Sequence, residues 1–189
     1  METDNLTTLT EMALANARRL LETTPEIVRV ALQAPDGRIC WLPMPPGISA
    51  IMNDGGAKDL FYGVLREHVE RTGATAVVVV NDAWVGVPTE KQERMGREEP
   101  AKLKAFAQGA SFNAFIEAGL ATRSEALVVT VQNAREARVI THAYERTGSG
   151  IVWGQRTEHT YPQGDFDGRL KMFGDPPGEV ARKHKLGTA

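Results

Sequence analysis

Three polar or aromatic side chains follow directly on a run of valines, and they are the first candidates for chemistry. Val77–Val80 is followed by Asn81, Asp82 and, after one alanine, Trp84. The end of a buried strand is a rigid support, so Asp82 could act as a general base or bind a cation, while Trp84 could wall a pocket. The structural alternative is that Asp82 begins a turn and Trp84 closes the end of the core.

A second group of candidate residues alternates along a later segment. Residues two apart in a strand share one face, and that face would carry Arg138, Ile140, His142, Tyr144 and Arg146. Two arginines, a histidine and a tyrosine suit an anion or an acidic partner. The solvent-facing side of an antiparallel sheet has the same pattern, and we prefer that interpretation. His142 is the best candidate for a titrating group.

Other kinds of site lack a signature in the sequence. The four histidines lie far apart with no paired spacing, so we predict no metal site and no cofactor. There is no phosphate-binding loop, dinucleotide fingerprint or nucleophile elbow. Cys40 is the only cysteine, which excludes an intrachain disulfide, and we expect it to be buried in the core.

Composition limits the class of protein. A chain of 189 residues fits one domain, and we predict a single domain over residues 1–175 followed by a basic, flexible tail over 176–189. The formal charge of -2 and the 6% aromatic content argue against nucleic acid as a partner. No apolar stretch is long enough for a membrane span and no signal peptide is recognisable, so we expect a cytoplasmic protein without membrane contact.

The elements that must position the candidate residues begin with a helix and a hairpin. Leucine and alanine at helical spacing predict an amphipathic helix from Asn5 to about Thr23. Glu26–Gln33 and Arg38–Met44 predict two strands joined by a turn at Pro35-Asp36-Gly37. Four consecutive valines put apolar side chains on both faces of a strand. The valine run therefore predicts a central strand that is buried on both faces.

A second helix should lead from Asp54 into the central strand and end at Gly73. Its predicted inner stripe consists of Ala57, Leu60, Phe61, Val64, Leu65 and His68. On this interpretation His68 is a hydrogen-bonded core residue. The outer face would carry two ion pairs four residues apart, Arg66 with Glu70 and Glu67 with Arg71.

After Trp84 the predicted order is a turn, a helical insertion and three strands. Val85–Pro88 is predicted to be turn-like, and the charged run Thr89–Pro100 predicts a solvated loop or exposed helix, with a mobile flap as the alternative. Ala101–Leu120 fits a bent helix or two short ones. Three strands follow with short connections, which predicts an antiparallel meander, at Ala126–Gln132, Ala137–Arg146 and Gly150–Thr157. The whole order predicts an α+β fold with a largely antiparallel sheet.

The chain resembles known proteins in two respects. The order of elements is similar to that of roadblock and profilin-like layouts, from which the insertion Val85–Arg123 departs. The strand Val77–Val80 with the following Asn-Asp-Ala-Trp resembles a pattern in bacterial and phage-type proteins, over about Glu70 to Gly154. That resemblance implies no established activity, so no catalytic role is carried over.

The leading functional hypothesis is therefore a cytoplasmic, non-catalytic binding or accessory protein that associates with itself or with a protein partner. It would use the sheet face or a cleft near Trp84. The alternative is a small hydrolase or transferase in which Asp82 and His142 meet beneath the Thr89–Pro100 segment. A third hypothesis is a sensor of a small ligand or anion through Arg138, His142 and Arg146.

Overall fold

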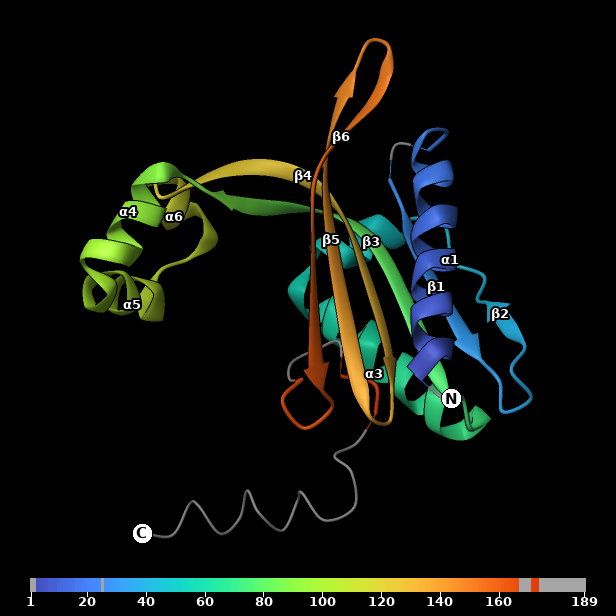
Figure 1. The fold of residues 1–189 in the computed structure, drawn as a ribbon. Helices are drawn as coiled ribbons and strands as arrows, with labels where there is room; N and C mark the ends of the chain where they lie inside the picture. Colours follow the sequence, from blue (N-terminus) through green and yellow to red (C-terminus); the bar gives the residue numbers. More distant parts are fainter. Residues whose placement is uncertain (1–2, 25, 167–170, 174–189) are drawn as a thin grey trace, which may run out of the picture. The chain divides into compact units, whose positions relative to one another are not determined.

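The computed structural model describes residues 3–24, 26–166 and 171–173 and shows an α+β fold, as predicted (Figure 1). In the described residues six strands form one antiparallel sheet of order β2-β1-β3-β4-β5-β6. The strands are β1 (Val28–Gln33), β2 (Ile39–Trp41), β3 (Ala76–Pro88), β4 (Ala121–Asn133), β5 (Glu136–Thr147) and β6 (Gly150–Pro162). The helices are α1 (Thr3–Leu21), α2 (Ile48–Asn53), α3 (Gly55–Thr72), α4 (Glu90–Glu98), α5 (Pro100–Gly109) and α6 (Phe112–Glu117).

The packing divides the chain into two compact units. Unit 1 draws on Met1–Asp82, Leu127–His142 and Arg156–Ala189, and unit 2 on Ala83–Ala126 and Ala143–Gln155. The single domain over 1–175 stays a prediction, and the predicted tail lies outside the described residues. Within those residues, no helix is both long and apolar enough to cross a membrane.

The valine run is the interior strand segment that the sequence predicts. Val77–Val80 lies in β3, and all four valines are buried. β3 pairs antiparallel with β1, with Val79 opposite Val30 and Val77 opposite Leu32. Successive side chains point to opposite faces, so both faces of the sheet must be covered by other elements.

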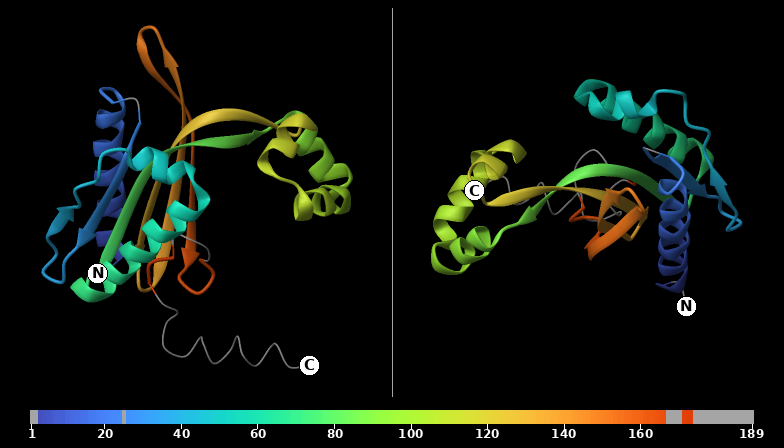
Figure 2. Two further views of the ribbon diagram at one scale, coloured as in Figure 1. Left: turned by 180° about the vertical axis from the view of Figure 1, so that it is seen from behind. Right: turned by 90° about the horizontal axis from the view of Figure 1, so that it is seen from above.

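Helices cover the two faces of the sheet in unit 1. Figures 1 and 2 show α1 on one face and α3 on the other. On the α3 face, Val77 and Val79 form one core cluster with Tyr62, Leu65 and Val69 of the helix. On the α1 face, buried leucines and alanines at helical spacing confirm the predicted amphipathic helix, at Leu6, Leu9, Ala13, Leu14, Ala17 and Leu21.

A charged contact ties α1 to β6 within unit 1. Nη2 of Arg156 lies 2.6 Å from Oε1 of Glu11 and 3.2 Å from Oε2 of Glu158. The hydrogen bond to Glu11 raises the pKa of Arg156, which is charged at all ordinary pH values in any case. The contact therefore works as a fixed positive charge between two carboxylates.

The predicted inner stripe of the second helix is wrong at Leu60 and Val64, and also at His68. Leu60 is 70% exposed and Val64 is 58% exposed, whereas Tyr62, Leu65 and Val69 are buried. The buried residues recur at i, i+3 and i+7, which is itself a helical stripe. The helix therefore presents a different face to the sheet from the one predicted.

The two predicted ion pairs on this helix change with that face. Nε of Arg66 donates to the backbone oxygen of Lys171 at 3.0 Å, and Nη2 of Arg71 lies 3.0 Å from Nδ1 of His68. Neither of the predicted pairs, with Glu70 and with Glu67, is found among the described residues. His68 is half-buried at the surface of the helix, so its prediction as a core residue is also wrong.

Three further expectations are corrected and one is confirmed. β3 continues through Val85–Pro88, where a turn was predicted, because Val85 and Val87 alternate with more exposed neighbours. β6 extends to Pro162 instead of ending at Thr157. Cys40 is exposed because β2 is the short edge strand of the sheet. The exposed-helix interpretation of the charged run is confirmed by α4, which has no buried residue.

Two leucines of α3 test the orientation of the helix with one kind of substitution. Leu65→Ala should lower the free energy of unfolding by about 2–5 kcal/mol, because it removes a side chain that is only 4% exposed. Leu60→Ala should change it by less than about 0.5 kcal/mol, because that side chain is already in solvent. Both are leucine-to-alanine changes within one helix, so the gain in helix propensity is common to them. Urea unfolding followed by circular dichroism measures the difference, and equal losses would contradict this orientation.

Candidate functional site

Asp82 lies at the point where the β1–β3 pairing ends. Its backbone N–H donates to the oxygen of Ile27 at 3.1 Å, and the N–H of Ile27 donates to Oδ1 of Asp82 at 2.9 Å. In a regular antiparallel pair the second bond would go to the backbone oxygen of Asp82. The carboxylate has taken that place, so it satisfies the last backbone donor of the ladder.

His142 lies on β5, two strands away from Asp82. β4 separates β3 from β5, and neighbouring strands are about 4.8 Å apart. Asp82 meanwhile directs Oδ1 toward β1, on its other side. A pocket shared by Asp82 and His142 stays a prediction, and the contact of Asp82 with Ile27 favours a structural role for this carboxylate.

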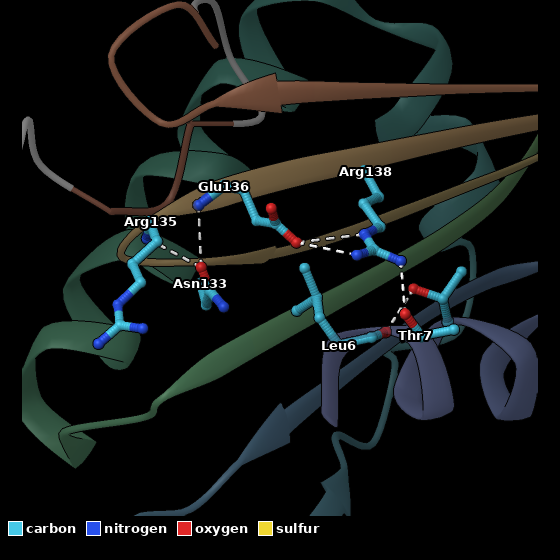
Figure 3. Close-up of polar contacts among 7 residues, drawn as sticks. Leu6, Thr7, Asn133, Arg135, Glu136 and Arg138 are labelled. Atoms are coloured by element: carbon cyan, nitrogen blue, oxygen red, sulfur yellow. Dashed lines mark hydrogen bonds and ion pairs between the residues drawn. The ribbon is translucent and has the colours of Figure 1, made fainter. Parts of the chain in front are cut away.

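The face of β5 that carries these candidates is buried from Ile140 to Tyr144, so its interpretation as a solvent-facing surface is wrong there, whereas Arg146 at its end is exposed. Ile140, His142 and Tyr144 are all buried. Arg138 reaches α1, where Nη1 donates to Oγ1 of Thr7 at 2.7 Å (Figure 3). Helix α1 thus occupies the side of the sheet to which Arg138 points.

The guanidinium of Arg138 is also bound by a neighbour on its own strand. Its Nε and Nη2 lie 3.2 and 3.1 Å from Oε1 of Glu136 (Figure 3). The N–H groups of Glu136 and Arg135 are in turn held by Oδ1 of Asn133, which closes the turn from β4 to β5. Arg138 therefore connects the turn to α1. Three of its nitrogen atoms already donate hydrogen bonds to Glu136 and Thr7.

The predicted residues that fall in unit 2 take part in three contacts with aromatic rings. The ring of Trp84 is 53% exposed, and the guanidinium carbon of Arg123 lies 4.0 Å from its centroid. The buried ring of Tyr144 lies 5.7 Å from that of Trp153, with the guanidinium of Arg146 5.5 Å from the Tyr144 centroid. Arginine over an aromatic face is a stabilising arrangement of about 0.5–1 kcal/mol at exposed sites.

A hollow that the sequence did not indicate lies in unit 1, along the outer face of α3. We call it the α3 groove. It has a volume of about 390 Å³. Seven apolar residues and three polar ones line it: Leu42, Pro43, Met44, Pro45, Phe61, Val64 and Leu65, with Glu67, His68 and Arg71. This volume and this mostly apolar lining are typical of sites for small molecules.

Each wall of the α3 groove follows from a local rule. The segment Leu42–Pro45 leaves β2 in an extended course, since each proline fixes its φ angle and disfavours helix in the residue before it. On the helix, Val64, His68 and Arg71 lie at i, i+4 and i+7, which is one face. This face is outward because Tyr62, Leu65 and Val69 have taken the inward position.

The residues of the α3 groove were missed because the helix offers two apolar stripes. Leu60, Phe61 and Val64 gave one stripe, and Tyr62, Leu65 and Val69 gave the other. The predicted stripe spans Ala57–His68 and shares Leu65 with the buried one, so no local feature of the helix decided between them. The other wall of the groove, Leu42–Pro45, lies outside the helix. No pattern within that segment indicates that it packs beside α3.

No group of three or more histidine, cysteine, aspartate or glutamate side chains that could hold a metal ion is found in the part of the chain that the structure describes. Comparison with protein-family models, with curated proteins and with solved structures finds no match to this chain.

Two substitutions of Asp82 separate a structural role from a catalytic one. Asp82→Ala removes the acceptor of the Ile27 N–H and should lower the free energy of unfolding by about 1–3 kcal/mol. Asp82→Asn keeps an oxygen at Oδ1 and should retain most of that stability. Chemical denaturation of both variants measures this. Equal losses of stability in the two variants would contradict the structural role.

Proposed function

We propose that this chain is a non-catalytic binding protein of the cytoplasm whose binding surface is the α3 groove. The single observation that carries the proposal is the groove itself, a hollow of about 390 Å³ with a mostly apolar lining and three polar residues. Small-molecule sites combine these properties, with the apolar wall supplying affinity and a few polar groups supplying orientation.

The exposed leucine and valine of α3 support the proposal. Val64 lines the groove and Leu60 lies one helical turn before it, and both are more than half exposed. Single exposed apolar residues are ordinary, but a pair on one helix face beside an apolar hollow favours a binding surface there. Burial of such side chains by a ligand or partner would be favourable by roughly 1–2 kcal/mol each.

The absence of a hydroxyl or thiol nucleophile among the described lining residues of the groove supports binding over catalysis. Its lining residues include no serine, threonine or cysteine. The earlier candidates have partners elsewhere in unit 1, Asp82 with Ile27 and Arg138 with Glu136 and Thr7. The hydrolase or transferase and the sensor through Arg138, His142 and Arg146 stay predictions.

A second candidate function is self-association through the exposed face of α3. Both edge strands are poorly suited to pair with another copy, because β2 has only three residues and β6 carries Arg156, Glu158 and Pro162. Short length, charge and proline are the usual protections of a sheet edge. The Leu60–Val64 face has no such protection, which favours it as the surface of contact between copies.

Two valines of matched exposure test the proposed binding surface. Val64→Asp places a charge in the wall of the groove and should weaken binding of the uncharged dye Nile red by about fivefold or more. Val152→Asp is the control, because Val152 is 55% exposed, close to the 58% of Val64, and belongs to β6. Fluorescence titration of the full chain gives the affinities. Equal affinities for the two variants, or no dye binding by the unsubstituted chain, would overturn the proposal.

A charge at Leu60 tests self-association. The unsubstituted chain should shift toward twice the mass of one chain as its concentration rises, and Leu60→Glu should hold it at one chain because the apolar contact then carries a charge. Val152→Glu should behave as the unsubstituted chain does. Sedimentation equilibrium over a concentration series measures the mass. A single-chain mass at every concentration would remove self-association and leave ligand binding in place.

A further inference from the structure

The polar groups of the α3 groove are close neighbours on a single helix. Glu67, His68 and Arg71 are its three polar lining residues, and they lie within a little more than one turn of α3. Residues four apart on a helix have neighbouring side chains, so the carboxylate of Glu67 and the guanidinium of Arg71 belong to the same rim of the groove. One negative and one positive group thus lie beside one apolar hollow.

His68 fixes one side of the Arg71 guanidinium. Nη2 of Arg71 lies 3.0 Å from Nδ1 of His68, and arginine can only donate, so Nδ1 is the acceptor. One of the five N–H donors of Arg71 is used in this bond, which leaves the others for a ligand and makes His68 a positioning residue for the guanidinium.

Glu67 has not been neutralised by Arg71. In the described part of the chain, the carboxylate of Glu67 forms no hydrogen bond or ion pair, although the four-residue spacing favours a pair with Arg71. Arg71 has turned to His68 instead. The rim therefore presents acceptor oxygens and guanidinium donors side by side, both able to reach a molecule in the groove.

We propose that the α3 groove binds a small zwitterion with a large apolar side chain, of the α-amino-acid type. The carboxylate of the ligand pairs with the guanidinium of Arg71, where two parallel N–H···O bonds are the favoured geometry. The ammonium group of the ligand pairs with the carboxylate of Glu67. The apolar side chain lies against Met44, Phe61 and Leu65. This inference rests on the proposed function and names its ligand.

The two charges of the rim select against simpler ligands. A plain carboxylate would meet Arg71 but would bring a like charge close to Glu67, and a plain amine would do the reverse. Like charges placed side by side are a common source of discrimination between partners. A purely apolar molecule would fill the hollow and leave both charges without a partner. The zwitterion is the ligand that pairs with both charged groups of the rim.

Three related molecules and two variants test the proposal. L-phenylalanine carries both charges, N-acetyl-L-phenylalanine lacks the ammonium group and L-phenylalaninamide lacks the carboxylate. In NMR titrations of the full chain, L-phenylalanine should bind most tightly, and loss of either charge should weaken binding by up to about fivefold, as expected for exposed ion pairs. Glu67→Gln should abolish the advantage over the acetylated molecule only, and Arg71→Gln the advantage over the amide only.

The outcomes separate the ligand class from the proposed function. Both substituted side chains are exposed, so each variant should keep the unfolding curve of the unsubstituted chain. Equal affinities of the unsubstituted chain for all three molecules would overturn the zwitterion, as would variants that weaken all three alike. No binding of any of them, with Nile red still bound at Val64, would reject this ligand and retain the binding protein. Loss of the Nile red site would reject both.

Discussion

The burial of Val77–Val80 on both faces is the constraint from which the rest of unit 1 follows. A strand of four consecutive valines leaves no face for solvent, so it needs a paired strand on each side and a helix above and below. β1 and β4 are its neighbours, and α1 and α3 cover its two faces. Each covering element then has one apolar side already assigned, namely the side that packs on the sheet.

The elements of this fold could be predicted from the sequence because their signals are local. Turn residues, helical spacing and the valine run each act within a few residues, and they gave the helix, the hairpin, the central strand and the meander in the right order. The sequence prediction ended β3 too early, and the reason is physical. The segment Val85–Pro88 was predicted to be turn-like, whereas Val85 and Val87 alternate with more exposed neighbours and keep the strand pattern.

The candidate residues were chosen by type, and the structure shows why type was insufficient. Asp82 bonds with Ile27, 55 residues away, and Arg138 bonds with Thr7, 131 residues away. In both cases a charged side chain forms a hydrogen bond with a distant part of the chain. Buried and half-buried polar groups commonly have this role. No pattern near Asp82 or Arg138 could have revealed these partners, because they depend on which strands and helices become neighbours.

The orientation of α3 determines the α3 groove and all of its polar residues together. The helix carries more apolar side chains than one buried stripe can hold, and the sheet takes Tyr62, Leu65 and Val69. The residues at i, i+4, i+7, i+8 and i+11 from Leu60 then share the opposite side, which puts Val64, Glu67, His68 and Arg71 on one outward face. Packing against the valines thus leaves two apolar side chains without cover and places a carboxylate, an imidazole and a guanidinium next to them. A binding surface on α3 follows from the way the core is filled.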